Sequence, residues 1–190
     1  MLAAGAGSRF GGGKLTAPWR GGVLLDGALA AAFAAPARTV SVVWGADDGV
    51  REAARAFAQG VGQAGRLHLI HAPRFAEGLS ASLIAGVASL AEDADGAFVF
   101  LGDMPRIPVA VLAPLARAVA DGAPAATPVF DDQRGHPVLF GRVLIPRLLE
   151  LTGDRGAGAL LKELGPAVAR VAAPDDGVLY DVDRREDLGR

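Results

Sequence analysis

The chain of 190 residues contains no cysteine, which excludes disulfide bonds, catalytic thiolates and cysteine-ligated zinc. It also lacks a basic excess, and its net charge of −2 argues against a general nucleic-acid-binding protein. No apolar run is long enough to cross a bilayer, and no basic-then-apolar signal peptide opens the chain. We therefore expect a cytoplasmic protein with no membrane or nucleic-acid partner.

The remaining composition is typical of a compact globular protein. Hydrophobic residues make up 51% of the chain, and its length suits one domain over residues 1–190 with a substantial core. The start is abrupt, because only Met1 to Ala4 precede a glycine-rich stretch, whereas a buried parallel strand usually runs about five or six residues. Either this first strand is short, or a few native residues upstream are missing.

Short β-rich apolar runs alternate with helical patterns along the chain. The predicted strands cover residues 39–43, 67–71, 97–101, 125–130, 137–140, 167–172 and 178–182. The predicted helices cover residues 24–34, 49–59, 80–91, 109–120, 144–151 and 158–164. This alternation predicts a mainly parallel sheet covered by helices on both faces. No helix intervenes between residues 125 and 140, so we expect a hairpin or antiparallel excursion there and a mixed sheet overall.

The opening stretch, MLAAGAGSRFGGGKL, combines five glycines with Arg9 and Lys14. It is not a Walker A loop, because Ser8 stands where that motif needs glycine and Leu15 follows the lysine. It is not the dinucleotide fingerprint either, since Phe10 occupies the third glycine position. Glycine nevertheless lets successive backbone N–H groups approach an anion, and the two cations add charge. We interpret the loop as a polyphosphate site of a third kind.

Aspartates stand where two predicted strands end. Asp103 follows strand 97–101, while Asp181 and Asp183 lie two residues apart in GVLYDVD and so on one face of an extended segment. Ligands bind beyond the carboxyl ends of such strands, which should place Asp103 beside the glycine loop. Mg²⁺ takes one or two carboxylates together with water and phosphate oxygens. The alternative for Asp183 is a helix N-cap, with Glu186 completing a capping box.

Six pieces of the sequence resemble one enzyme family. MocA-like molybdenum cofactor cytidylyltransferases, a branch of the MobA-like family, contain similar pieces in the same order: LAAGAGSRFGGGKL, EGLSASLIAGV, FVFLGDMP, RGHPVLF, LTGDRGAGALL and YDVDRREDL. The resemblance implies a Rossmann-like nucleotide-diphospho-sugar transferase fold, with three layers (α/β/α) around a mixed, mostly parallel sheet. It also implies Mg²⁺-dependent transfer of CMP from CTP to the phosphate of the molybdenum cofactor (molybdopterin), with release of pyrophosphate.

The same resemblance assigns roles to individual residues. The catalytic residues would be Arg9, Lys14 and Asp103, and the metal ligands would be Asp103 and Asp183. The nucleotide-binding residues would be Leu2, Ala3, Ala4, Gly5, Gly7, Ser8, Lys14, Ser80 and Ser82. The acceptor-binding residues would be His136, Asp154 and Arg155. Plainer roles stay open for some of these: Ser80 as a helix N-cap, His136 as a structural histidine, and Asp154 with Arg155 as an ion pair in a turn.

The choice of nucleotide depends on one position in the loop. In the resembled family, LAAG at this position accompanies cytidine and LAGG tends to accompany guanosine. The methyl group of Ala4 leaves less room for the edge of a purine, and one such clash weakens binding by about 1–3 kcal/mol. We therefore expect CTP. The alternatives are a MobA-type guanylyltransferase, an enzyme of the same fold acting on methylerythritol phosphate or a sugar phosphate, and a plain nucleotide-binding module. A further alternative is a non-catalytic chaperone that hands the cofactor to a molybdenum hydroxylase.

Overall fold

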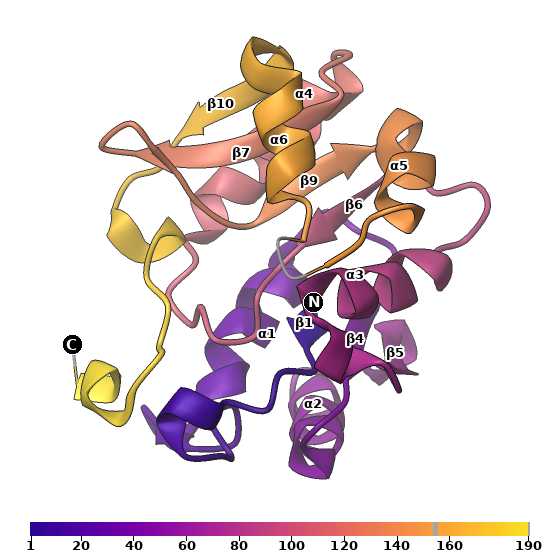
Figure 1. The fold of residues 1–190 in the computed structure, drawn as a ribbon. Helices are drawn as coiled ribbons and strands as arrows, with labels where there is room; N and C mark the ends of the chain where they lie inside the picture. Colours follow the sequence, from indigo (N-terminus) through magenta and orange to yellow (C-terminus); the bar gives the residue numbers. More distant parts are fainter. Residues whose placement is uncertain (154–155, 190) are drawn as a thin grey trace.

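The computed structural model describes residues 1–153 and 156–189 and shows helices on both sides of a twisted sheet (Figure 1). Strands β1 (Leu2–Ala3), β4 (Val40–Trp44) and β5 (Leu67–His71) are parallel, in the order β1-β4-β5. Strands β6 (Gly96–Val99), β9 (Val138–Gly141), β7 (Ala125–Phe130) and β10 (Val168–Ala172) follow in the order β6-β9-β7-β10. In this second group, β9 runs antiparallel to both of its neighbours.

The two groups of strands meet at β1. The N–H group of Leu2 donates to the carbonyl of Phe100 at 2.8 Å, and Gly102 donates to the carbonyl of Leu2 at 2.9 Å, forming a parallel bridge between Leu2 and Leu101. The order across the molecule is therefore β5-β4-β1-β6-β9-β7-β10. Because β1 and β6 are parallel neighbours, the loops after their carboxyl ends open at the same edge of the sheet, where the glycine loop and Asp103 begin.

Alternating strand residues supply two separate cores. Val42 packs with helices α1 (Leu24–Ala34), α2 (Asp48–Gly60) and α4 (Leu112–Ala120) on one face. The next residue, Val43, packs with α3 (Leu79–Ala88), α5 (Ile145–Leu149) and α6 (Gly158–Leu164) on the other. Burial of both faces explains why a run such as residues 97–101 is continuously apolar. The predicted mixed α/β architecture is confirmed.

The shorter elements surround this sheet. A small hairpin joins β2 (Pro18–Trp19) to β3 (Gly22–Val23), and β8 (Gln133–Arg134) pairs antiparallel with β7. The 3₁₀ turns span Ser8–Phe10, Ala64–Arg66, Phe75–Glu77, Val109–Val111, Arg142–Leu144, Gly165–Ala167, Asp176–Val178 and Arg185–Gly189. The hairpin expected between residues 125 and 140 is confirmed by the pairing of β7 with β8 and β9.

One predicted strand is absent, and one alternative role is excluded. Residues 178–182 do not form a strand, because they are held to neighbouring loops by single bonds instead of a ladder: the carbonyl of Val178 accepts from His136, and the N–H group of Val182 donates to the carbonyl of Asp103. Ser80 is not the N-cap of α3, because Gly78 occupies that position and Ser80 lies inside the first turn. No helix in the described part of the chain is long and apolar enough to span a membrane.

Candidate active site

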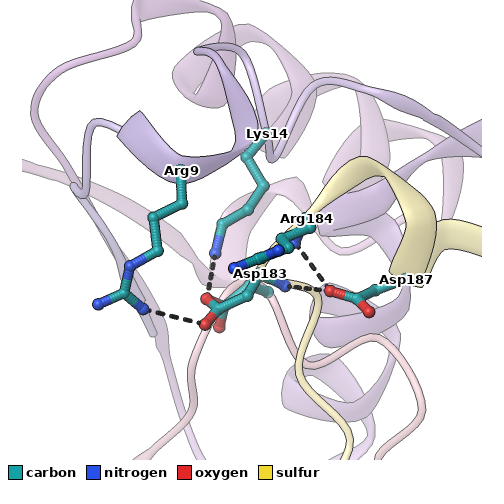
Figure 2. A network of polar contacts seen from close by, with 6 residues as sticks. Arg9, Lys14, Asp183, Arg184 and Asp187 are labelled. Carbon is teal, nitrogen blue, oxygen red and sulfur yellow. Dashed lines mark hydrogen bonds and ion pairs between the residues drawn. The ribbon is translucent and has the colours of Figure 1, made fainter.

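The glycine loop turns sharply after β1. Its 3₁₀ turn begins behind Gly7, whose φ of 59° lies in the left-handed region that glycine adopts without strain. A Cβ atom on Gly7 would lie 3.0 Å from the Cβ atom of Lys14, so the absence of a side chain lets the two ends of the loop approach. The carbonyl of Gly7 also accepts from Gly12 at 3.2 Å. This fold-back places the side chains of Arg9 and Lys14 side by side (Figure 2).

Bonds to neighbouring elements fix the far end of the loop. Phe10 and Leu15 are buried in the core, and the carbonyl of Leu15 accepts from the N–H group of Leu25 in α1 at 3.0 Å. The hydroxyl of Thr16 donates to a carboxylate oxygen of Asp47, which also caps the start of α2. Lys14 therefore projects from a backbone that is tied to two helices.

Lys14 and Asp103 form the central contact of the site. The Nζ atom of Lys14 lies 2.6 Å from Oδ2 of Asp103, and their side chains are only 13% and 25% exposed. The two residues follow neighbouring strands, since Lys14 lies in the loop after β1 and Asp103 lies just beyond β6. The expectation that Asp103 lies beside the glycine loop is therefore confirmed by this contact. The pair is partly shielded from water, which strengthens its electrostatic interaction.

Asp183 joins both cations of the glycine loop. Its Oδ2 atom lies 3.2 Å from Nη1 of Arg9, and its Oδ1 atom lies 3.8 Å from Nζ of Lys14 (Figure 2). The carboxylates of Asp103 and Asp183 thus contact the same ammonium group from two distant parts of the chain. Their backbones are linked as well, because Val182 donates to the carbonyl of Asp103 at 3.0 Å.

The alternative role of Asp183, as the N-cap of a capping box with Glu186, is excluded. The carboxylate that caps the final turn belongs to Asp187, which accepts from the N–H groups of Asp183 at 3.2 Å and Arg184 at 2.8 Å (Figure 2). Glu186 instead lies 3.8 Å from the guanidinium of Arg184. The side chain of Asp183 is consequently directed to Arg9 and Lys14 and not to its own backbone.

Asp181 is a third carboxylate at this site, for which the family resemblance assigned no role. Burial raises the pKa of Asp181, and the neighbouring charges of Asp103 and Asp183 raise it further, whereas Lys14 lowers it. Asp181 is therefore close enough to Asp103, Asp183 and Lys14 for their charges to affect its ionisation. The sequence signal for Asp181 was its position in GVLYDVD, two residues before Asp183.

His136 lies next to these carboxylates. Burial lowers the pKa of its imidazole, although the carbonyl of Val99 and the charges of Asp103 and Asp181 act in the opposite direction. Its Nδ1 atom lies 3.4 Å from the carbonyl oxygen of Val99. The preceding Gly135 allows a close approach, since a Cβ atom there would lie 2.3 Å from the carbonyl oxygen of Val178. Because burial lowers its pKa, the imidazole of His136 is neutral at neutral pH.

The other predicted nucleotide-binding residues are arranged around β1 and α3. Leu2, Ala3 and Ala4 are buried in or just after β1, whereas Gly5, Gly7 and Ser8 line the outer part of the loop. Ser80 and Ser82 are buried near the start of α3, and the hydroxyl of Ser80 has no hydrogen-bond partner among the described residues. Within residues 1–153 and 156–189, neither serine is hydrogen-bonded to Lys14 or Asp103. Asp154 and Arg155 lie outside the described residues.

The donor set suits a hard divalent cation. Asp103 and Asp183 already share one positive charge, and Asp181 lies within electrostatic reach of both. Within residues 1–153 and 156–189, no group of three or more His, Asp or Glu side chains is close enough to hold a metal by itself. Mg²⁺ commonly takes only one or two protein carboxylates and completes its shell with water and phosphate oxygens, so these residues fit that ion.

At the edge of this α/β sheet, a glycine loop with two cations faces Asp103, which follows β6, and Asp183, which comes from the carboxyl-terminal segment. This arrangement is typical of the nucleotidyltransferase class. The comparison with protein families makes this assignment specific, because residues 1–168 match the model of the MobA-like NTP transferase domain. The chain belongs to this family, which confirms the resemblance found in the sequence.

Individual relatives agree with this assignment. The chain is 26% identical over 150 residues to the molybdenum cofactor cytidylyltransferase of Escherichia coli, covering 79% of this chain and 72% of the relative. The crystal structure of Rv0371c from Mycobacterium tuberculosis superposes with a TM-score of 0.79 at 25% identity, covering 100% of this chain and 93% of that one. A second structure of Rv0371c, in complex with manganese, has a TM-score of 0.75 at 25% identity and covers 100% and 94% of the two chains.

Proposed function

We propose that this protein transfers CMP from CTP to the terminal phosphate of the molybdenum cofactor and releases pyrophosphate. The observation that carries this proposal is the 2.6 Å contact between Lys14 and Asp103, with Asp183 and Arg9 joined to the same cluster. Cations and carboxylates brought together beyond the ends of β1 and β6 match the needs of a triphosphate and a divalent metal. The similarity to a molybdenum cofactor cytidylyltransferase supports the choice of acceptor.

The reaction is a displacement at the α-phosphorus of CTP. An oxygen of the acceptor phosphate forms a new P–O bond, the bond between the α-phosphorus and the bridging oxygen breaks, and pyrophosphate leaves with that electron pair. The attacking phosphate is already ionised at neutral pH, so no side chain has to remove a proton from it. Catalysis then depends on alignment and on neutralisation of the charge that develops on the oxygens.

Lys14 and Arg9 would neutralise the charge that develops on the phosphate oxygens. Lys14 emerges from a backbone anchored to α1 and α2, so its ammonium group has a defined position, whereas the exposed Arg9 side chain can follow the leaving group. The two cations would bind the β- and γ-phosphates and balance the charge on pyrophosphate. Asp103 and Asp183 would hold Mg²⁺, which supplies additional positive charge for the phosphate oxygens when bound.

His136 is assigned to binding of the acceptor. Its neutral ring can donate or accept a hydrogen bond without placing a further charge beside Asp103 and Asp181. Ser80 is assigned to the nucleotide, because its buried hydroxyl has no partner within the described chain and a nucleotide hydrogen bond would satisfy it. Ala4 is buried directly after β1, at the start of the loop, where its methyl group would favour cytosine over guanine.

The proposal is tested by measuring pyrophosphate release from CTP with the molybdenum cofactor and Mg²⁺. We expect turnover by the original protein and a loss of at least about 100-fold in Asp103→Asn, which removes one charge while keeping the shape of the side chain. Asp121→Asn is the matched control, because Asp121 is an exposed residue at the end of α4, away from the site. Binding of the cofactor without any pyrophosphate release would instead support a chaperone.

Nucleotide choice is measured separately with CTP, GTP, ATP and UTP in a thermal-shift assay containing Mg²⁺. A ligand at 100 times its dissociation constant adds about 2.7 kcal/mol, which corresponds to roughly 5–10 °C for a chain of this size. We expect CTP to give the largest shift. A larger shift with GTP would assign the protein to guanylyl transfer, and equal shifts for all four nucleotides would contradict base selection by Ala4.

A further inference from the structure

Asp183 lies on a part of the chain that has left the sheet. Residues 173–189, which we call the C-terminal segment, follow β10 and contain two 3₁₀ turns but neither a strand nor an α-helix (Figure 1). Asp103, in contrast, lies in a loop of residues 102–107 that begins directly beside β1. The relative position of the two carboxylates therefore depends on the contacts that hold the C-terminal segment against this loop.

Two backbone contacts bring the C-terminal segment and the loop together. The N–H group of Val182 donates to the carbonyl of Asp103 at 3.0 Å, and the side chain of Val182 is fully buried. A Cβ atom on Gly177 would lie only 2.1 Å from the carbonyl oxygen of Arg106, so the two backbones pass closer than a side chain would allow. These contacts fix the segment as far as Val182, which is the residue before Asp183.

The side chain of Arg106 joins the same two parts of the chain. Its guanidinium carbon lies 4.6 Å from the centre of the Tyr180 ring, and its Nη2 atom lies 3.1 Å from Oδ1 of Asp176. Arg106 comes three residues after Asp103, and Tyr180 comes three residues before Asp183. The Arg106 side chain is only 30% exposed, which strengthens both contacts relative to contacts on an open surface.

Tyr180 extends this connection to the backbone of Asp183. Its hydroxyl donates to the carbonyl of Asp187, whose carboxylate accepts from the N–H groups of Asp183 and Arg184 (Figure 2). We call these contacts of Arg106, Tyr180 and Asp187 the clamp. The clamp forms a continuous path from the loop that carries Asp103 to the backbone of Asp183.

The ion pairs of Asp183 cannot replace the clamp once a nucleotide binds. The side chains of Asp183 and Arg9 are 48% and 77% exposed, and exposed ion pairs contribute little to holding a side chain in place. The phosphates of a bound triphosphate would also compete with Asp183 for Arg9 and Lys14. Only the clamp and the neighbouring backbone contacts would then fix the position of Asp183.

We propose that Arg106 and Tyr180 are positioning residues, which hold Asp183 beside Asp103 so that both carboxylates can bind one divalent cation. The inference rests on the proposed function, because it is the metal-bound triphosphate that requires both carboxylates. Mg²⁺ accepts only near-ideal octahedral geometry, so a small displacement of one carboxylate loses a ligand. Loss of the clamp should therefore weaken metal-dependent binding far more than it weakens binding to the glycine loop.

The test measures binding of a non-hydrolysable CTP analogue by calorimetry, once with Mn²⁺ and once with EDTA, and without any acceptor. We expect Arg106→Met to weaken binding in Mn²⁺ by about tenfold or more and binding in EDTA by less than about twofold. Tyr180→Phe keeps the ring but removes the hydroxyl, and should weaken binding in Mn²⁺ by about threefold or more. Arg106→Lys should recover part of the loss, because an ammonium group can also lie over the ring of Tyr180.

Amide hydrogen exchange without nucleotide or metal tests the clamp independently of the proposed function. We expect exchange at Asp183 and Arg184 to become at least about tenfold faster in Arg106→Met. Arg142→Met is the matched control and should leave binding and exchange at these amides unchanged. Arg142 also connects two loops, through bonds to the carbonyls of Glu92 and Ala94, but at the opposite end of β6 from Asp103.

The possible results separate the two proposals. If the original protein does not bind the analogue with Mn²⁺, the proposed function is contradicted, and the exchange rates still test the clamp. Unchanged exchange at Asp183 in Arg106→Met would overturn the clamp. Equal losses of affinity in Mn²⁺ and in EDTA would overturn the positioning role, because they would show a general structural effect.

Discussion

Replacing Lys14 with methionine tests the electrostatic design of the site most informatively. Methionine keeps most of the side-chain length but removes the ammonium group that lies 2.6 Å from Asp103 and 3.8 Å from Asp183. Asp103 then loses its neutralising partner while remaining three-quarters shielded from water. We expect a loss of stability of about 1–3 kcal/mol, between the values typical of exposed and of buried ion pairs.

This loss corresponds to a fall in Tm of roughly 2–12 °C for a protein of this size. Activity should fall much further, by about 100–1000-fold, because Lys14 would neutralise the leaving pyrophosphate in the transition state. The assays are thermal unfolding and pyrophosphate release on the same preparations. Lys162→Met serves as the matched control, since Lys162 is exposed on α6 and should show neither effect.

A double mutant separates electrostatics from packing. In Lys14→Met with Asp103→Asn, the unpaired carboxylate is gone, so part of the stability lost in Lys14→Met should return. Activity should stay low because both groups are needed for charge neutralisation. If Lys14→Met keeps Tm within about 1 °C and activity within about threefold of the original protein, the reasoning about this cluster is refuted.

The remaining predictions concern the residues around this cluster. Gly135→Ala should destabilise the protein by about 1–3 kcal/mol in denaturant unfolding, because a methyl group would lie 2.3 Å from the carbonyl of Val178; an unchanged midpoint would contradict the close approach. Burial lowers the pKa of His136, so the unfolded chain binds a proton at this residue before the folded chain does as pH falls below about 6.5. The original protein should therefore lose more stability between pH 7 and pH 5 than His136→Gln. Parallel curves of stability against pH for the two proteins would contradict this. Burial raises the pKa of Asp181, so its ionised form lowers the stability of the folded protein at neutral pH. Asp181→Asn should therefore raise Tm at pH 7, and the gain should shrink as pH falls toward 4. A gain in Tm that does not depend on pH would argue for a packing effect.

The sequence was sufficient for the arrangement of elements and for the main contact of the site. Apolar runs alternating with helical patterns predicted the layers, and the positions of Lys14 and Asp103 after neighbouring strands predicted that they would approach each other. Both predictions rest on general properties of parallel sheets, in which the carboxyl ends of strands share one edge.

Local chemistry around the site was harder to predict. GVLYDVD has the composition of a strand, but its backbone bonds singly to the loops at His136 and Asp103, and composition carries no information on such long-range partners. The sequence also could not tell which acidic residue caps the final turn. In the structure Asp187, and not Glu186, accepts hydrogen bonds from the N–H groups of Asp183 and Arg184.

The most direct test of the central claim is a crystal structure with a non-hydrolysable CTP analogue and Mn²⁺, using the anomalous signal of the metal. We expect one anomalous peak in contact with the carboxylates of Asp103 and Asp183, with the phosphates of the analogue bound to Lys14 and Arg9. A nucleotide bound elsewhere on the molecule, or a metal peak remote from both aspartates, would contradict the account.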